Sequence, residues 1–401
     1  MIAIYADNFD RARFFLRLAK GLKTEVIFLT TKPSAYLYLK RFFKCYLITV
    51  NSGFTQASTD FPSDKVIDSF THVYRGTQSS EQALKVYNAV FAFCSNIDES
   101  IECAFVFNGN SASQTAFVNA YKSKDVPIVF CEISNLPGKV LFDSAGVNAK
   151  SILYGQPQIL DNLPSVSNSD HENWLNVYFD YKRNPIPQGK ITAPLSLAYL
   201  LDAVSFSLGF GLREENVTLL KKISNSMLMV GTKKKQLLKS INFDLSKDYV
   251  FFPTQVRFDS QLIVNSDIDN EQAIEYASKL AMKHNMKLLV KIHPAEEDIE
   301  IIKSYYELQK KYAFEIVSNN TSELILQANH VVVINSTVGL EALLLHKDVT
   351  VLGRAIYSQF DYERVKKYIH HYLINFDYFS NEKISISEAN KASSLFGLNL
   401  R

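Results

Sequence analysis

Short runs of β-branched and aromatic residues alternate with longer amphipathic runs, in two separate stretches of the chain. Strand-sized apolar runs that alternate with helix-sized amphipathic runs are typical of parallel sheets covered by helices. The chain has 401 residues, a length that suits two domains better than one. We therefore expect an α/β fold with two domains, each built on a parallel sheet covered by helices.

The first stretch predicts a doubly wound domain. Its expected strands are 2–5, 25–29, 46–50, 104–107 and 128–133. The helices between them are expected at 10–22, 32–43, 81–94 and 113–122. From about residue 152 to residue 229 the pattern predicts helices alone.

The second stretch returns to the alternating pattern. Its expected strands are 249–252, 287–292, 314–317, 330–334 and 349–352, with helices at 271–284, 298–310 and 338–346. We therefore expect residues 1–240 to form the first domain, with a helical extension at about 152–240, and residues 241–380 to form the second. Residues 381–401 are expected to pack back on the first domain, or to mark the edge of a longer polypeptide.

The charge of the chain excludes some classes of partner. Lys and Arg number 43 against 41 Asp and Glu, which gives a formal net charge of +2. Nucleic-acid binders usually carry a strongly basic stripe, so we expect no nucleic-acid partner. No apolar run is long enough to span a membrane, and Asp7, Asp10 and Arg11 interrupt the apolar core that a signal peptide needs. We therefore expect a cytoplasmic protein.

Polar residues at strand ends are the first candidates for a binding site, because ligands of open parallel sheets bind beyond the carboxyl ends of the strands. The expected strand 287–292 contains Lys291 and is followed by His293 and Pro294. A histidine fixed there can donate to a phosphate or carboxylate, and the lysine adds positive charge. An ordinary strand-end turn with an exposed histidine explains the pattern equally well.

A second candidate follows the expected strand 330–334. The motif NST at 335–337 leads into a helix that has Gly339 and Glu341 in its first turns. The N–H groups and the dipole of a helix start bind phosphate, and the Glu341 carboxylate can accept from ribose hydroxyls. Capping alone explains Ser336 equally well. It does not explain Gly339, where we expect the backbone to approach a ligand.

A third candidate is the loop after the expected strand 249–252. This loop holds Gln255, Arg257 and Asp259, with a serine next to the aspartate. A carboxylate beside an arginine and a hydroxyl can act as a nucleophile or a base. A salt-bridged helix cap is the alternative interpretation.

The first domain also has polar residues after its expected strands. Asn108 and Gly109 follow one strand, and Glu132 and Lys139 lie at and beyond the end of the next. We expect them on the acceptor side of a cleft, if the two domains open towards each other. Asn108-Gly109 is also a common turn dipeptide, which weakens its value as a signal.

Four sequence blocks resemble the capsule polysaccharide biosynthesis proteins, the bacterial retaining β-Kdo glycosyltransferases. They are KIHP at 291–294, the run at 330–357 that contains VVINSTVGLEALLLHKDVTVLG, QVRFDSQ at 255–261, and the first-domain loop with CEISNLPGK and DSAGVNAKS within 131–151. The resemblance extends over about residues 100–360. It implies a GT-B architecture, in which two Rossmann-like domains face each other across a cleft and the second holds the nucleotide sugar.

The resemblance also implies roles for single residues. Asp259 matches the family's proposed nucleophile of a double displacement, Glu132 is the candidate general acid/base, and His293 assists the departure of CMP. The implied donor-binding residues are Lys291, His293, Asn335, Ser336, Thr337, Gly339, Glu341 and Gln255. The residues expected on the acceptor side or in the cleft are Asn108, Gly109, Lys139 and Arg257.

The implied reaction moves β-Kdo from CMP-β-Kdo to a glycan acceptor, with retention of configuration, in capsule, O-antigen or other surface polysaccharide synthesis. No metal or cofactor is expected, since no DxD-like motif follows a first-domain strand. Further implications are a lipid-linked acceptor, peripheral association with the inner face of the cytoplasmic membrane, and a place as one module of a larger polypeptide. The alternatives are another cytidylyl-donor transferase, using CMP-sialic acid or CDP-glycerol, and an inactive sugar-nucleotide-binding module.

Overall fold

The computed structural model of the chain describes two compact units. The described residues are 1–50, 62–134, 136–183, 197–215, 240–257, 260–296 and 298–394. Unit 1 comprises those within 1–152, 167–224 and 370–401, and unit 2 comprises those within 153–166 and 225–369.

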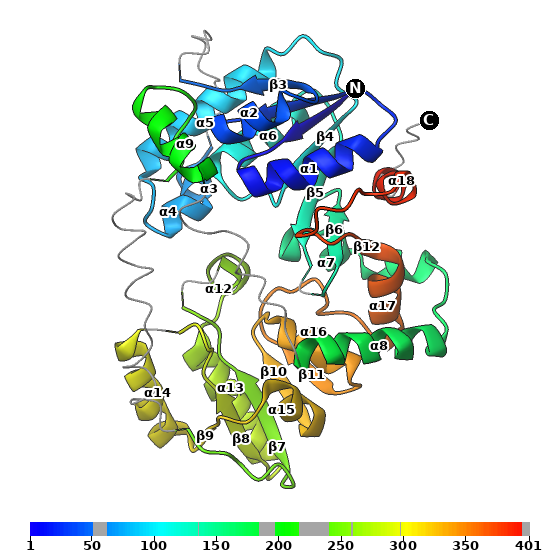
Figure 1. The fold of residues 1–401 in the computed structure, drawn as a ribbon. Helices are drawn as coiled ribbons and strands as arrows, with labels where there is room; N and C mark the ends of the chain where they lie inside the picture. Colours follow the sequence, from blue (N-terminus) through cyan, green and yellow to red (C-terminus); the bar gives the residue numbers. More distant parts are fainter. Residues whose placement is uncertain are drawn as a thin grey trace. The chain divides into compact units, whose positions relative to one another are not determined.

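Unit 1 is built on a seven-stranded sheet in the order β12-β6-β5-β4-β1-β2-β3 (Figure 1). Its five parallel strands are β1 (Ile2–Tyr5), β2 (Val26–Thr30), β3 (Lys44–Leu47), β4 (Cys103–Phe107) and β5 (Ile128–Ile133). β6 (Lys139–Asp143) runs antiparallel to β5, and β12 (Ile374–Asn375) runs antiparallel to β6. Every residue of β1, β2 and β4 is buried, as expected for a sheet with helices on both faces.

The helices of unit 1 begin where the sequence supplies caps. The Asn8 Oδ1 accepts from the Arg11 N–H at 2.8 Å at the start of α1, and Ser111 and Gln114 form a capping box at the start of α6. The longer helices are α1 (Phe9–Gly21), α2 (Pro33–Leu39), α5 (Ser80–Ser95), α6 (Ala112–Lys122), α8 (Asn168–Arg183), α9 (Leu197–Ser207) and α18 (Ile386–Ser394). The shorter ones are α3 (Asp64–Asp68), α4 (Thr71–Tyr74) and α7 (Ile152–Gly155), the last spanning the boundary between the units.

The last described helix, α18, packs against α1 (Figure 1). A Cβ added to Gly21 would lie 2.9 Å from the Ala389 Cβ, so the two helices are in close contact there. Ala389 and Ala392 join Phe14 and Phe15 in the same buried cluster. The C-terminal segment thus completes the core of unit 1.

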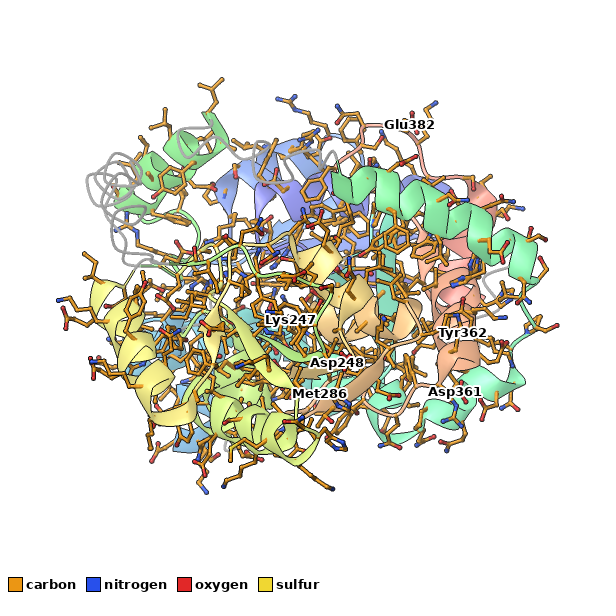
Figure 2. The ribbon with its side chains drawn as sticks, turned by 90° about the horizontal axis from the view of Figure 1, so that it is seen from below. Lys247, Asp248, Met286, Asp361, Tyr362 and Glu382 are labelled. Atoms are coloured by element: carbon orange, nitrogen blue, oxygen red, sulfur yellow. The ribbon has the colours of Figure 1, made fainter. Side chains whose placement is uncertain are left out.

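Unit 2 has an entirely parallel sheet in the order β11-β10-β7-β8-β9. The strands are β7 (Tyr249–Pro253), β8 (Lys287–Lys291), β9 (Glu315–Ile316), β10 (His330–Val333) and β11 (Asp348–Val351). The connecting helices are α12 (Ser260–Asn265), α13 (Asn270–Lys283), α14 (Ile299–Tyr312), α15 (Thr321–Gln327), α16 (Thr337–Leu344) and α17 (Tyr362–Lys367). Figure 2 shows Asp248 and Met286 close together at the amino ends of the paired strands β7 and β8.

Residues 153–166 fall in unit 2, whereas the sequence pattern placed them in the extension of the first domain. The Arg364 guanidinium explains the difference. It donates to both carboxylate oxygens of Asp161, at 2.9 and 2.7 Å, and the Lys367 ammonium donates to the Asp161 carbonyl at 2.9 Å. Asp161 is thereby tied to α17, which is a contact that local sequence patterns do not reveal.

The predicted α/β class, with parallel sheets, is confirmed. The predictions missed β6 and β12, because these short strands give no alternating β/α signal. The last part of the predicted helical stretch, residues 216–229, lies outside the described residues. That the two sheets face each other across a cleft stays a prediction. None of the helices within the described ranges is long and apolar enough to cross a membrane.

Candidate functional site

Unit 2 brings several predicted residues to one edge of its sheet. Gln255 follows β7, His293 follows β8, and Asn335 follows β10. β7 pairs with both β8 and β10 in parallel, so these three strand ends are neighbours. This is the edge at which open parallel sheets bind ligands.

Gln255 and Asn335 are buried and bonded to each other. The Gln255 Nε2 donates to the Asn335 Oδ1 at 2.9 Å, and the Gln255 Oε1 accepts from the Asn335 backbone N–H at 3.2 Å. The Asn335 Nδ2 donates to the carbonyls of Gln261 at 2.7 Å and Asn265 at 3.1 Å. These bonds connect the ends of β7 and β10 to α12, so both amides have a structural function whether or not they contact a donor.

The start of α16 carries the NST motif. The Ser336 Oγ accepts from the Val338 N–H at 3.3 Å, which confirms that Ser336 caps the helix. Gly339 is buried in the first turn, where an added Cβ would lie 2.6 Å from the Tyr357 Oη and 2.8 Å from the Val333 Cγ2. The glycine is therefore explained by the close packing of the Tyr357 ring, which the sequence pattern did not show. Its role in ligand approach stays a prediction.

Glu341 and Thr337 lie on the same short helix and are half-buried. Tyr357 is buried beside Glu341, and burial, followed by the charge of that carboxylate, raises the pKa of the Tyr357 hydroxyl. The hydroxyl donates to the Ser336 carbonyl. Tyr357 thus fixes the loop that leads into α16.

His293 is exposed at the end of β8. Its Nδ1 accepts from the Ala295 N–H at 3.1 Å, so in the neutral ring the proton lies on Nε2. Its backbone N–H donates to the Thr254 Oγ1 at 3.0 Å, which holds the residue against the β7 end. This geometry allows Nε2 to donate to an anion.

Lys291 is half-buried, and its ammonium donates to the Asn319 carbonyl. Burial lowers its pKa, and the Glu323 carboxylate partly opposes that shift. Arg257 is exposed, and its backbone N–H donates to the Glu296 Oε2 at 3.4 Å. Asp259, the predicted nucleophile, lies outside the described residues.

Unit 1 contains a cavity of about 340 Å³ at the carboxyl ends of β1, β2 and β4. The sheet order reverses between β1 and β4, and this reversal is where doubly wound sheets bind ligands. We call this cavity the switch-point cavity. Its lining residues are Asp7, Asn8, Arg11, Lys32, Thr71, His72, Arg75, Asn108, Ser111, Gln114, Tyr199, Asp202, Ala203, Phe206, Arg213, Glu214 and Glu215.

Asp7 and Arg11 lie one helical turn apart and form an ion pair in this cavity. Their side chains are only 13% and 19% exposed. The Asp7 Oδ2 also accepts from the Gln114 Nε2 at 3.0 Å, while its buried Oδ1 has no hydrogen-bond partner among the described residues. Burial raises the pKa of Asp7, and the Arg11 charge only partly opposes the shift.

Glu132 at the end of β5 is connected to this cavity through Asn108 and Arg11. Its carboxylate is hydrogen-bonded by Asn108, which lines the cavity, and it interacts electrostatically with Arg11. Burial raises the pKa of Glu132 more than these two groups lower it. A carboxylate with a raised pKa suits general acid/base chemistry.

Two further acids anchor the walls of the cavity. Glu214 accepts from the Thr31 hydroxyl at 2.9 Å and from the Ser113 hydroxyl at 2.7 Å. Asp202 on α9 accepts from the Ser34 N–H and hydroxyl, both at 2.7 Å. These bonds hold α9 and the segment after it against β2, α2 and α6.

The other first-domain candidates lie outside the lining of this cavity. Gly109 has a φ of +74°, and an added Cβ would lie 2.8 Å from the Phe130 ring, so the turn needs glycine there. Lys139 is buried in β6, where burial and the charge of Lys391 lower its pKa to about 8. Of the four residues expected on the acceptor side, Asn108 is thus the one that lines the cavity.

Sequence reasoning missed most of the switch-point cavity. Only Ala6 separates Asp7 and Asn8 from the expected strand 2–5, so both are polar residues at a strand end. Glu296 was also missed. It is a buried acid that accepts from the backbone N–H groups of Arg257 and Asp298, at 3.4 and 3.1 Å, and joins two loops of unit 2.

Comparison with known proteins adds a family match. Residues 214–360 match the model of the family described as capsule polysaccharide biosynthesis protein. Protein FixF of Sinorhizobium fredii (strain NBRC 101917 / NGR234) is 38% identical over 119 residues, which are 29% of this chain and 29% of that relative. The match to this curated relative therefore spans less than a third of its length.

Two solved structures are similar to this chain over most of its length. Thermosulfurimonas dismutans KpsC, beta Kdo 2,7 transferase, is 14% identical with a TM-score of 0.45, and the similarity covers 98% of this chain and 99% of that one. KpsC of the same organism, beta Kdo 2,4 transferase, is 13% identical with a TM-score of 0.42, over 73% of this chain and 87% of that one.

The resemblance to capsule polysaccharide biosynthesis proteins is thus confirmed over residues 214–360, the stretch that contains all of the predicted donor-binding residues.

Proposed function

We propose that this chain is a GT-B glycosyltransferase that moves β-Kdo from CMP-β-Kdo to a glycan acceptor in surface polysaccharide synthesis, with retention of configuration. The family match over residues 214–360 carries the proposal, because this stretch holds every donor-binding candidate. The neighbouring strand ends of β7, β8 and β10 support it, since they gather Gln255, His293 and Asn335 at one sheet edge.

The proposed donor site is centred on His293 and the start of α16. The Nε2–H of His293 donates to a phosphate oxygen of CMP, because its Nδ1 is already engaged by Ala295. The Thr337 N–H lies at the start of α16, where the helix dipole favours an anion. Lys291 adds positive charge from the same strand, and Glu341 accepts from ribose hydroxyls.

The proposed chemistry is a double displacement. The Asp259 carboxylate attacks the anomeric carbon of Kdo while the bond to the CMP phosphate oxygen breaks, and CMP leaves with the bonding electrons. The acceptor hydroxyl then attacks the same carbon, the bond to Asp259 breaks, and Glu132 takes the hydroxyl proton. Two inversions at one carbon give net retention.

The family resemblance also supports the proposed setting of the reaction. We place the enzyme in the cytoplasm, at the inner face of the cytoplasmic membrane, acting on a lipid-linked acceptor. This setting is tested by co-sedimentation of the protein with vesicles that carry the lipid-linked glycan, compared with vesicles that lack it.

The deciding experiment is incubation of the protein with CMP-Kdo and a panel of glycan acceptors, followed by mass spectrometry of the glycans and of the intact protein. We expect CMP release, glycan products heavier by one or more Kdo units, and a protein adduct of one Kdo that acceptor removes. Asp259→Ala should abolish transfer and adduct while CMP still binds, and His293→Ala should weaken donor use.

The matched controls are Asp267→Ala and His284→Ala. Asp267 is 84% exposed in its ion pair with Arg354, and His284 is exposed at the end of α13, so both variants should keep wild-type turnover. CMP release from CMP-sialic acid, or turnover of CDP-glycerol, in place of CMP-Kdo refutes the donor assignment. Binding of CMP without turnover of any donor favours an inactive module.

A further inference from the structure

Helix α9 presents an apolar face to solvent. Its exposed apolar side chains recur three or four residues apart, which is the spacing of one helical face. Leu197 is 85% exposed, Val204 is 62% exposed, and Leu208, directly after the helix, is 68% exposed. A surface helix of a globular protein normally carries polar residues on this side. We call the exposed members of this face the apolar stripe: Leu197, Leu200, Leu201, Val204 and Leu208.

The opposite face of α9 fixes the helix to unit 1. The Asp202 carboxylate accepts from the Ser34 N–H and hydroxyl at the start of α2, both at 2.7 Å. The Phe206 ring lies on the same inner face, and the Lys32 ammonium lies 5.3 Å from its centre. Because these contacts hold the inner face, α9 cannot rotate to bury the apolar stripe without breaking them. The outward position of the stripe is therefore built into the packing of α9.

The neighbouring helix α2 continues this surface with positive charge. α2 contacts both α9 and α1 (Figure 1). Leu37 is exposed on α2, and Lys40 and Arg41 are exposed three and four residues later, on the same face. Phe42 is also exposed, and the Lys20 ammonium of α1 lies 4.2 Å from the centre of its ring. We call Lys20, Lys40 and Arg41 the basic rim.

The positive charge of the basic rim is not cancelled by neighbouring carboxylates. Residues 26–59 contain no Asp or Glu. Within the described ranges, none of the three rim side chains forms an ion pair. The two acids that other elements bring to this region face other cations, since Glu99 pairs with Lys44 at 2.6 Å and Asp202 interacts with Lys32. The surface thus combines exposed apolar side chains with uncompensated positive charge.

The surface of an anionic bilayer fits both features. With 11 residues, α9 is shorter than the roughly 20 that span a bilayer. A helix that lies in the membrane plane inserts its apolar side chains at the interface, and nearby Lys and Arg side chains bind anionic headgroups. A second copy of the chain fits less well, because the apolar stripe falls short of the roughly 20 to 30 residues that each partner of a stable dimer contributes.

We propose that the apolar stripe and the basic rim form a docking surface of unit 1 for a bilayer that contains anionic lipids. The stripe inserts between the headgroups, and the rim binds their negative charge. As the means by which the enzyme reaches a lipid-linked acceptor, the inference rests on the proposed function. Docking itself needs neither a sugar donor nor a glycan, so the two can be tested separately.

The test is co-sedimentation of the full chain with vesicles that carry no glycan. One set of vesicles is phosphatidylcholine alone, and the other is phosphatidylcholine mixed with phosphatidylglycerol. We expect at least about tenfold tighter binding to the mixed vesicles, because each Lys or Arg near an anionic surface contributes about fivefold. This preference should decline as salt rises, since salt screens the attraction to the headgroups.

Two double variants test the apolar stripe. Leu197→Gln with Val204→Gln should weaken binding to the mixed vesicles at least about tenfold, because the two side chains no longer bury apolar area at the interface. The matched control is Val177→Gln with Leu326→Gln, which makes the same changes at exposed positions of α8 and α15. The control should bind as the wild type does. All four residues are exposed, so both variants should fold, and circular dichroism melting curves check this.

A third variant tests the basic rim. Lys40→Gln with Arg41→Gln should weaken binding to the mixed vesicles about tenfold or more and leave binding to phosphatidylcholine alone unchanged. Lys65→Gln with Lys283→Gln removes two charges from exposed positions outside this surface and should leave both affinities unchanged.

A wild-type chain that does not sediment with the mixed vesicles, or that binds both sets of vesicles equally, overturns the proposal. So does an equal loss of binding in the Leu197→Gln, Val204→Gln variant and its matched control. If the wild type is instead a dimer in analytical ultracentrifugation and this variant is a monomer, the stripe is an interface between copies and the proposal fails. Vesicle binding without turnover of any donor leaves docking standing and refutes the proposed transferase function. Turnover of CMP-Kdo onto soluble glycans without vesicle binding does the reverse.

Discussion

Asn335→Ala should destabilise unit 2 strongly, because this amide joins three segments of it. The substitution removes the hydrogen bonds from Asn335 to the Gln261 and Asn265 carbonyls, at 2.7 and 3.1 Å, and the one accepted from Gln255 at 2.9 Å. Three buried bonds at about 1 kcal/mol each, with the penalty for the polar groups left unpaired, give a loss of about 3–5 kcal/mol.

The assay is thermal unfolding, with hydrogen exchange read by mass spectrometry to show which unit opens. A loss of this size lowers the melting temperature of a domain of this size by roughly 6–20 °C. Faster exchange is expected in β7 and β10, and not in β1 or β4. Trp174 belongs to unit 1, so its fluorescence should report little of the change.

Asn329→Ala is the matched control. Its side chain accepts from the Tyr249 N–H and donates to the Asp248 Oδ1, both at 2.9 Å, but it is exposed, so water replaces part of what is lost. We expect a loss of about 1 kcal/mol. If Asn335→Ala costs no more than Asn329→Ala, the structural account of the Gln255–Asn335 pair is refuted. Combining Asn335→Ala with Gln255→Ala should cost at least about 1 kcal/mol less than the sum of the two.

Three further substitutions test other parts of the structure. Asp143→Ala should lower the free energy of unfolding in urea by about 3–5 kcal/mol, because it leaves the Ala145 N–H, the Ile152 N–H and the Tyr372 hydroxyl without their acceptor. A loss no larger than that caused by Asp98→Ala, at an exposed position, contradicts this. Gly339→Ala should be destabilising, because overpacking against Tyr357 and Val333 costs about 1–3 kcal/mol against a helix-propensity gain of about 1 kcal/mol; Gly155→Ala, which meets no atom within 4 Å, should not destabilise. Burial raises the pKa of Glu132, so the folded state binds its proton more tightly than the unfolded state, and stability falls as pH rises from the ordinary carboxyl range to the raised pKa. Glu132→Gln should remove that loss, and a stability difference from wild type that stays constant over this pH range refutes the interpretation.

The fold was largely predictable, because its central strands are apolar runs flanked by helix patterns. β1 was predicted with its observed bounds, and so was β5. β3 was expected two to three residues too late, since its Lys44 start is exposed and polar. β12 has only two residues, and its partner β6 lies more than 200 residues earlier in the chain. No local sequence pattern therefore predicts this strand.

The candidate residues of unit 2 were found because they follow strands in recognisable motifs. What the sequence did not show is how each side chain is used. Gly339 is required by the Tyr357 ring, which lies 18 residues later in the chain, and the Gln255 amide is engaged by Asn335, 80 residues away. Such pairings depend on tertiary contacts, so a motif alone does not separate a ligand contact from a structural one.

Polar residues at strand ends indicate a binding site only where the protein itself does not use their hydrogen-bonding groups. In unit 2 the amides at the ends of β7 and β10 satisfy each other, so their polarity is used within the protein. In unit 1 the ends of β1 and β2 bring Asp7 and Lys32 to a cavity where, among the described residues, the Asp7 Oδ1 has no hydrogen-bond donor. Buried polar groups that the chain itself does not satisfy are costly. A ligand that satisfies them recovers that cost, so the unsatisfied groups point to a binding site more directly than the strand-end rule does.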